Sequence, residues 1–344
     1  MKKWFIIPLA MLLLFCGCGK DTEDTATHTQ VFAMDTVMDL TVYGSSSDAA
    51  DALSAAEDEI NRLDALLSRH NENSAVSAIN KSCGAPVETD SEVLALLKTA
   101  VHYSDLTDGA FSITVAPIMD AWNFMGSNPR VPSRAELDEL LTHVGDDRIL
   151  FTDSTVTLED NMAVDLGGIA KGYTSDRLAA LFEEEGVRSA MVSLGGNVYV
   201  RGTKPNGSRW RVAVEDPNDP GNYLGVLSLA DQFAITSGGY QRYFEQDGVT
   251  YYHIIDPHTG DVARSGLLSA TVVCGSGTMG DALSTALFVM GYDRAVEFWK
   301  TSGLDFDMIL SDKEGRVYLT EGLKDLFDAS PAEHSYEYIY LTKN

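Results

Sequence analysis

The chain is poor in cysteine. Only four of its 344 residues are cysteines, and two of these, Cys16 and Cys18, lie in a short segment near the N-terminus. Cys83 and Cys274 are the other two, too few for a disulfide framework or a cysteine-based zinc site. We expect both to be buried thiols, and their spacing does not decide whether they pair.

The chain is also poor in positive charge. It carries 25 Lys and Arg residues against 51 Asp and Glu residues, which gives a formal net charge of −26. Nucleic acid is therefore excluded as a partner, because its phosphates require a cationic surface. A phosphate-bearing ligand needs Mg²⁺ or oriented backbone N–H groups to offset the repulsion.

Common catalytic signatures are missing too. The sequence contains neither G-x-S-x-G nor H-E-x-x-H, so serine-hydrolase and zincin chemistry have no support. The glycine-rich segment around Lys171 is not a Walker A loop, because Gly172 follows the lysine.

The N-terminus has the pattern of an export signal. Lys2 and Lys3 precede an apolar run, residues 4–15, that is too short for a stable membrane span. The run ends in Phe-Cys-Gly-Cys, which resembles a bacterial lipobox with Cys18 as the lipidated residue. We predict a signal peptide at 1–17, a lipidated polar tether at 18–30 and one catalytic domain at 31–344. The protein is then exported and lipid-anchored to the outer, periplasmic face of the bacterial cytoplasmic membrane; an uncleaved signal anchor is the alternative.

Hydrophobic periodicity and capping residues predict an α+β fold. We expect two closely packed lobes of mixed or antiparallel sheet with helices, and an active cleft between the lobes. Helices are expected to begin near Ser45, Asp90, Ser133, Ala170 and Met279. Strands are expected at residues 31–43, 189–194, 209–215, 225–237, 242–245, 249–255 and 267–274, with a short strand before Asp165 and hairpins at 148–159 and 307–320.

One glycine-rich segment precedes a helix that carries oxygen ligands. Residues 275–280 (GSGTMG) fit the G-x-G-x-x-G dinucleotide fingerprint, but no second parallel strand with a terminal acid follows, so the match is weak. Asp281 and Thr285 follow at i and i+4, on one face of the helix, with Ser284 beside them. Such hard oxygen ligands suit Mg²⁺. Taken alone, the pair is better explained as an N-cap aspartate with a packed threonine.

Two further segments carry polar groups near glycines. Residues 165–172 (DLGGIAKG) expose backbone groups and place Lys171 as a phosphate or carbonyl partner, although a simple tight turn explains the glycines too. His253 is expected at a strand end, with Asp256 close enough to orient it or to act on its own. A structural histidine is the alternative.

Seven motifs in order resemble the ApbE family of FAD:protein FMN transferases, over nearly all of the mature chain. They are MDT (34–36), DGAF (108–111), DLGGIAKGY (165–173), SLGGN (193–197), SGGYQRYF (237–244), HIIDPHTG (253–260) and DALSTA (281–286). The resemblance implies an ApbE-like, T-fold-like architecture with FAD in an elongated cleft. Its implied reaction is Mg²⁺-dependent transfer of FMN from FAD to a Thr hydroxyl of a target flavoprotein as a phosphoester, with AMP as the leaving group; Mn²⁺ is the alternative metal. The implied acceptors are subunits of redox membrane complexes of the Na⁺-translocating or Rnf type.

The resemblance also assigns site residues. It places the metal at Asp281 and Thr285, with Ser284 beside them and a backbone carbonyl of Gly168 or Ala170 completing the shell. His253 matches the proposed proton acceptor, aided in our hypothesis by Asp256. The implied flavin-binding positions are Met34, His70, Ala110, Phe111, Ser112, Asp165, Lys171, His253 and Ile254.

The sequence departs from the family pattern at two of these places. Asp35 stands where many members have glycine, and His70 where members often have an aromatic residue. Two other functions stay open: Mg²⁺-dependent hydrolysis of the FAD pyrophosphate to FMN and AMP, and a non-catalytic flavin-binding lipoprotein.

Overall fold

The computed structural model describes residues 25–124, 126–219, 221–240 and 242–343. The predicted signal peptide and Cys18 lie outside these residues. The first described element is strand β1, Thr25–Ala33, so residues 25–30 of the predicted tether belong to the folded domain. The threonines at 25, 27 and 29 explain this correction, because β-branched residues at alternate positions favour a strand.

The centre of the molecule is a nine-stranded sheet in the order β1-β2-β6-β7-β10-β13-β14-β15-β17. All neighbouring pairs are antiparallel except β15 and β17, which are parallel. The strands are β1, β2 (Thr36–Gly44), β6 (Ser189–Leu194), β7 (Asn197–Arg201), β10 (Gln232–Gly238), β13 (Leu267–Cys274), β14 (Phe306–Asp312), β15 (Arg316–Thr320) and β17 (Glu337–Leu341).

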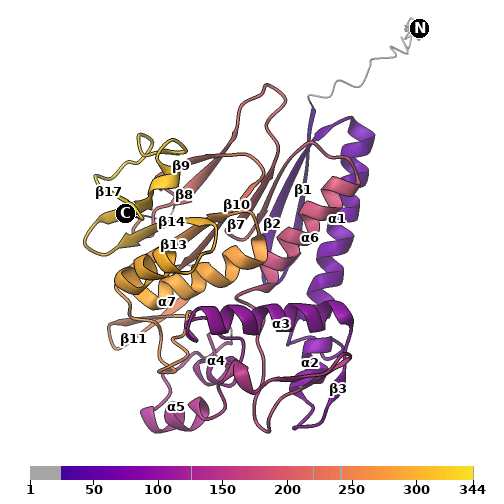
Figure 1. The fold of residues 1–344 in the computed structure, drawn as a ribbon, viewed down its shortest axis with the longest axis vertical. Coiled ribbons are helices and arrows are strands. Elements are labelled where there is room, and N and C mark those ends of the chain that lie inside the picture. Colours follow the sequence, from indigo (N-terminus) through magenta and orange to yellow (C-terminus); the bar gives the residue numbers. More distant parts are fainter. Residues whose placement is uncertain (1–24, 125, 220, 241, 344) are drawn as a thin grey trace, which may run out of the picture.

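Helices α1 (Ser46–Leu67), α6 (Ala170–Glu184) and α7 (Gly277–Thr301) pack on one face of this sheet (Figure 1). A three-stranded sheet of β8 (Trp210–Glu215), β9 (Tyr223–Leu229) and β16 (Phe327–Asp328) contributes to a separate apolar cluster with side chains of β7, β10, β13, β14 and β15. Alternate side chains of β10 supply the two clusters, with Ile235 in the first and Ala234 in the second. The period-2 pattern of the strands therefore builds both layers.

The second part of the molecule lies between β2 and β6 in the chain and below α6 and α7 in Figure 1. Its helix α3 (Ser91–Leu106) contacts α7 and shares a buried core with the C-terminal end of α1. The remaining elements are α2 (Ala75–Asn80), α4 (Ala116–Trp122), α5 (Arg134–Leu141), the 3₁₀ helix at Asp146–Arg148, and a small sheet of β3 (Val87–Glu88), β4 (Leu150–Phe151) and β5 (Thr155–Thr157). The predicted α+β fold in two packed parts is confirmed.

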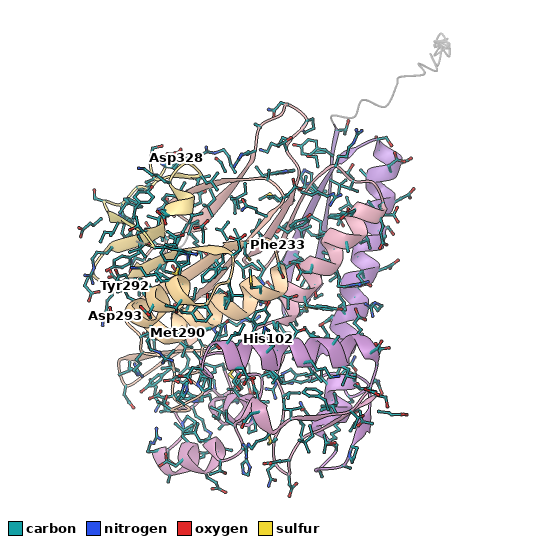
Figure 2. The ribbon with its side chains drawn as sticks, in the orientation of Figure 1. His102, Phe233, Met290, Tyr292, Asp293 and Asp328 are labelled. Carbon is teal, nitrogen blue, oxygen red and sulfur yellow. The ribbon has the colours of Figure 1, made fainter. Side chains whose placement is uncertain are left out.

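Capping explains why the helices begin where the sequence predicts. The side chains of Ser45, Asp90 and Ser133 accept backbone N–H groups at the starts of α1, α3 and α5. Ser276 caps α7 in the same way, and this helix continues to Thr301 across a kink at Gly291, where φ is 76°. Beyond the kink lies Tyr292 (Figure 2), and its ring packs on that of Tyr318 with the centroids 4.2 Å apart.

Several strand predictions need correction. Residues 31–43 form two strands rather than one, because Met34 and Asp35 both take positive φ and turn the chain back. Residues 225–237 divide between β9 and β10 at Asp231, whose φ is also positive. The short strand predicted before Asp165 does not form in the described residues.

The segment after β10 forms a separate two-stranded ribbon, β11 (Tyr243–Gln246) and β12 (Val249–Tyr252), joined by a turn at Asp247-Gly248. The hairpin predicted at 307–320 is confirmed as β14–β15, but the 3₁₀ helix Glu321–Leu323, β16 and β17 follow it. Cys274 is buried, as predicted, and burial raises the pKa of its thiol to about 12. Cys83 is exposed, contrary to prediction, and both thiols are free.

Candidate active site

A cavity of about 1160 Å³ lies where the two parts of the molecule meet. Its walls come from the β1–β2 turn, the segments 67–70 and 110–124, the start of α6, the end of β10, the His253 segment and the first turns of α7. Thirteen of the predicted site residues line it: Met34, His70, Ala110, Phe111, Ser112, Asp165, Gly168, Ala170, Lys171, His253, Ile254, Asp281 and Thr285. Segments far apart in sequence therefore form one site.

The starts of α6 and α7 are in direct backbone contact beside the cavity. The N–H of Gly172 donates to Asp281 Oδ2 at 2.8 Å, and Asp281 is only 3% exposed. A Cβ atom on Gly172 would lie 2.2 Å from the carbonyl oxygen of Gly277. Glycine at 172 is thus required for this approach, which presents the Asp281 carboxylate to the cavity.

Replacing Gly172 with Ala tests this contact. Alanine is the better helix former by about 1 kcal/mol, but the added methyl group forces α6 and α7 apart. We expect a net loss of about 1–3 kcal/mol in the free energy of unfolding, measured by urea denaturation. Gly275→Ala is the control, because a Cβ atom there meets no atom within 4 Å. Equal stability of the Gly172 and Gly275 variants would show that the helices have room to adjust.

The glycine-rich segment 275–280 holds a carboxylate of the chain itself. Asp176 of α6 accepts the backbone N–H groups of Gly277 and Thr278 at 2.6 and 2.8 Å and the hydroxyls of Ser276 and Thr278. The anion that the start of α7 favours is therefore internal. This contact explains the dinucleotide-like pattern as a helix junction.

Thr285 and Ser284 meet Ser237 at the end of β10. The hydroxyl of Ser237 lies 3.2 Å from Thr285 Oγ1 and 2.9 Å from Ser284 Oγ. Thr285 lines the cavity, whereas Ser284 is fully buried and donates to the carbonyl of Asp281 at 3.0 Å. Ser284 therefore positions its neighbours rather than facing the cavity.

The oxygen atoms near Asp281 suit a hard cation. A Cβ atom on Gly168 would lie 3.8 Å from Thr285 Oγ1, so the glycine turn of residues 167–170 approaches the Thr285 hydroxyl. Across the described residues, no three His, Cys, Asp or Glu side chains converge on one point that could hold a metal. A cation here would depend on one carboxylate, hydroxyls and backbone carbonyls, a donor set that fits Mg²⁺ or Mn²⁺ and not zinc.

Arg69 and Asp165 hold the glycine turn in place. Asp165 accepts the N–H of Gly167 at 2.8 Å, and its other oxygen lies 2.8 Å from Nε of Arg69. Arg69 also pairs with Asp120 at 2.7 Å. The Lys171 ammonium lies 3.5 Å from the Gly167 carbonyl, within the same lining. Lys171 thus brings a positive charge to this lining, whereas the charge of Arg69 is already paired with two carboxylates.

Asp146 organises the opposite wall. Its buried carboxylate accepts the hydroxyls of Ser112 and Thr114 and the backbone N–H groups of Ile113 and Thr114, at 2.6–3.1 Å. These bonds satisfy the buried carboxylate and fix the loop that presents Ala110, Phe111 and Ser112.

His253 is half-buried on the cavity wall. Its Nδ1 lies 3.3 Å from the carbonyl of Arg242, and the tautomer that donates this bond leaves Nε2 as a proton acceptor. Burial, with the positive charges of Arg242 and Lys171, lowers its pKa from 6.5 to about 4. The imidazole is therefore neutral at pH 7, the state that a general base requires.

Asp256 does not orient His253, contrary to our hypothesis. Its carboxylate accepts the backbone N–H of His258 at 2.9 Å and lies 3.2 Å from the ring of His258. The turn that begins at Asp256 directs this side chain to the residue two positions ahead. Ile255 and Pro257 line the cavity on either side of it.

The lowered pKa of His253 predicts a pH dependence of stability. Below pH 6.5 the histidine binds a proton in the unfolded chain, whereas in the folded chain it binds one only near pH 4. The free energy of unfolding therefore decreases as the pH falls from 6.5 to 4. We expect the free energy of unfolding of the native chain to drop relative to His253→Gln, by at most about 1.4 kcal/mol per pH unit over this window. Denaturant titrations at several pH values measure the difference. A difference that does not vary with pH would contradict the lowered pKa.

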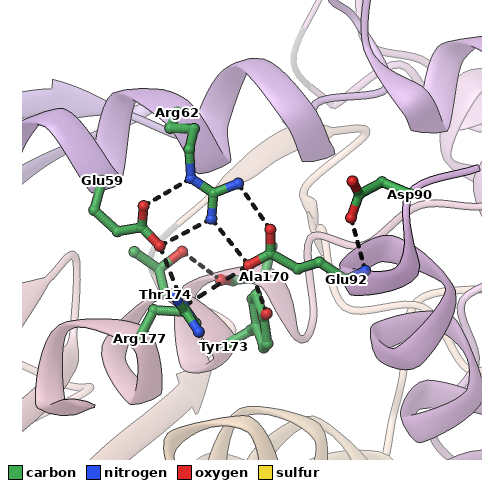
Figure 3. Close-up of polar contacts among 8 residues, drawn as sticks. All are labelled: Glu59, Arg62, Asp90, Glu92, Ala170, Tyr173, Thr174 and Arg177. Atoms are coloured by element: carbon green, nitrogen blue, oxygen red, sulfur yellow. Dashed lines mark hydrogen bonds and ion pairs between the residues drawn. The ribbon is translucent and has the colours of Figure 1, made fainter. Parts of the chain in front are cut away.

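A network of charges ties three helices together behind the site (Figure 3). Arg62 of α1 pairs with Glu59 of the same helix and with Glu92 of α3, each at 2.7 Å. The positive charge of Arg62 lowers the pKa of each of these two carboxyls below the usual value. Tyr173 of α6 donates to Glu92 at 2.7 Å, and Arg177 lies 3.2 Å from Glu59. The network fixes α3 against the start of α6, where the lining residue Lys171 lies.

Sequence reasoning missed several residues of the cavity. They are Asp64, Arg69, Asp120, Ser237, Tyr240 and Arg242, together with Asp146 behind the wall. Arg69 stands next to the predicted His70, and Ser237, Tyr240 and Arg242 lie in a motif quoted above, so position in a motif was the only available signal. Asp64, which accepts the N–H of Met34 at 3.2 Å, stands in a helix with no motif.

The fold and the cavity define an α+β enzyme with its site between two packed parts. The chain belongs to the ApbE family, whose model matches residues 34–310. It is 32% identical to a FAD:protein FMN transferase of Vibrio cholerae over 94% of this chain and 98% of the relative, and 32% identical to that of Escherichia coli K12 over 91% and 93%. The ApbE protein of Thermotoga maritima superposes with a TM-score of 0.83 at 34% identity, over 88% of this chain and 99% of that one. A flavinyl transferase ApbE of Pseudomonas stutzeri has a TM-score of 0.79 at 26% identity, over 90% and 99%.

None of the helices in the described part of the chain combines the length and apolar character needed to cross a bilayer.

Proposed function

We propose that the protein transfers FMN from FAD to a threonine hydroxyl of an acceptor protein and releases AMP. The observation that carries the proposal is the convergence of Asp281, Thr285, Lys171 and His253 on one large cavity. Relatives at 32% identity named FAD:protein FMN transferase support the transfer of FMN from FAD to a protein.

The chemistry follows from the residues present. The acceptor hydroxyl oxygen forms a bond to the phosphorus that carries the riboflavin half of FAD, and the bond from that phosphorus to the bridging oxygen breaks, so AMP leaves. The hydroxyl proton passes to Nε2 of His253, which is neutral at pH 7. Lys171 lies among the groups able to balance the pyrophosphate charge.

Asp281 and Thr285 would hold the metal, with a backbone carbonyl of Gly168 or Ala170. When bound, Mg²⁺ supplies neutralisation of pyrophosphate charge and polarisation of the reacting phosphoryl group. Asp281 has one oxygen fixed by Gly172 and faces the cavity, so the chain itself orients this ligand.

The test is incubation with FAD, Mg²⁺ and a flavoprotein domain that carries an acceptor threonine, followed by intact-mass spectrometry. We expect the acceptor mass to increase by one FMN phosphoester, with AMP released in equal amount. AMP release without acceptor would support the pyrophosphate hydrolase instead. Retention of uncleaved FAD with acceptor and Mg²⁺ present would support a flavin-binding lipoprotein.

We also propose that the mature chain is anchored through a lipid on Cys18 at the periplasmic face of the cytoplasmic membrane. The support is the short apolar run and the Cys-Gly-Cys sequence before the folded domain. Palmitate labelling of cells is expected to mark the native chain and not Cys18→Ser, and equal labelling of both would contradict the anchor.

A further inference from the structure

Strand β1 is an unprotected edge of the main sheet. In the part of the chain that the structure describes, β1 pairs with β2 alone and lies at the end of the sheet opposite to β17 (Figure 1). Its nine residues, TATHTQVFA, contain no lysine, no proline and no carboxylate. Proteins usually block such an edge with these residues or with a bulge. The absence of these devices on a strand of this length indicates an edge that accepts a partner.

The register shows which backbone groups face outward. Met34 and Asp35 form a two-residue turn with positive φ, and Ala33 pairs with Thr36. In a hairpin of this type the closing pair is hydrogen-bonded, so the next pair, Phe32 and Val37, is not. The N–H and C=O groups of Phe32 therefore point away from β2, and those of Gln30 and His28 do the same.

This edge leads to the cavity. Phe32 lines the cavity while 72% exposed, and its cross-strand neighbour Val37 is 51% exposed. These two exposed side chains form an apolar step on the sheet, with Phe32 at the cavity mouth. The proposed reaction requires a hydroxyl on a polypeptide to enter the same mouth. A strand that pairs with β1 and runs past Phe32 brings its own side chains to that place.

We propose that an extended segment of the acceptor protein adds to β1 as a further strand and delivers its threonine into the cavity. The inference rests on the proposed transferase function. Backbone bonds to Gln30 and Phe32 supply binding that tolerates different sequences, and an apolar side chain against Phe32 and Val37 supplies preference. The expected partner segment is extended and has an apolar residue before its threonine.

A proline in β1 tests the pairing. Gln30→Pro removes an outward N–H and places a ring at the edge while it spares the backbone bonds to β2. It also removes the exposed side-chain bond from Gln30 Nε2 to Asp39 at 2.7 Å. We expect kcat/KM for the acceptor domain to fall about tenfold or more, with the Kd for FAD unchanged. Thr250→Pro is the matched control. Thr250 lies in β12 and pairs with Glu245, one pair away from the two-residue turn at Asp247-Gly248. Its N–H therefore also points away from the partner strand. Equal losses in both variants would overturn the assignment.

A second pair of variants tests the apolar step without proline. Val37→Ser is expected to raise KM for the acceptor severalfold, while Val249→Ser, at a valine that is 39% exposed on β12, leaves it unchanged. Wild-type acceptor kinetics in both Gln30→Pro and Val37→Ser would overturn the inference. So would a change of oligomeric state in Gln30→Pro with unchanged acceptor kinetics, because a second copy would then occupy the edge. If the native chain flavinylates no acceptor, the proposed function itself fails, a result distinct from these.

Discussion

Replacing Asp281 with Ala is expected to lower FMN transfer at least about a hundredfold and to remove its dependence on Mg²⁺. Asp281 is the buried carboxylate at the cavity, and its partners for a cation are hydroxyls and carbonyls, which cannot compensate for a lost charge. Initial rates of acceptor flavinylation over a Mg²⁺ titration measure the effect.

Two controls separate metal binding from folding. Asp281→Asn retains an oxygen to accept the N–H of Gly172, so this variant should unfold near the native temperature while losing Mg²⁺ dependence. Asp293→Ala removes an exposed carboxylate of the same helix beyond its kink (Figure 2) and should leave the rate unchanged. Native activity in Asp281→Ala would remove this carboxylate from the metal site.

Replacing His253 with Ala is expected to lower the rate of transfer about 10²- to 10⁴-fold, the usual contribution of a positioned general base. The imidazole is neutral at pH 7 and lines the cavity, whereas water is a weaker base and is not fixed by the chain. Single-turnover measurements with bound FAD isolate this step from FAD binding.

His258→Gln is the matched control for His253. His258 lies five residues further along, is exposed, and contacts Asp256 at 3.2 Å. This variant and Asp256→Asn should transfer FMN at the native rate, since both residues belong to the turn. A rate lost in Asp256→Asn and retained in His253→Ala would reverse the assignment that the contacts support.

The sequence predicted features that depend on local spacing. Capping residues located the starts of α1, α3 and α5, and the i, i+4 pair of Asp281 and Thr285 lies at the cavity as helix geometry requires. The family motifs located most of the lining, since thirteen predicted residues meet there.

Contacts between distant residues were not predictable in the same way. Arg69 forms an ion pair with Asp165 across the site. Asp176 caps helix α7, which begins about a hundred residues later in the chain. Neither partner marks the other in the sequence, because the choice depends on how α6 packs against α7. For Asp256, proximity in sequence led to a wrong prediction. We expected its carboxylate to orient His253, but the turn directs the carboxylate to His258.

The connection between β2 and β6 has a consequence for the order of folding. The chain leaves the sheet at Gly44 and returns at Ser189, which pairs with Tyr43. Closing such a long connection costs chain entropy before the pairing is gained, and contacts of this sequence separation slow folding. During synthesis, both edges of the β1–β2 hairpin stay unpaired until the ribosome has made β6. Pulse-labelled hydrogen exchange during refolding should therefore protect the amides of β2 that face β6 no earlier than those of β6, and earlier protection in β2 would show that another segment shields the hairpin meanwhile.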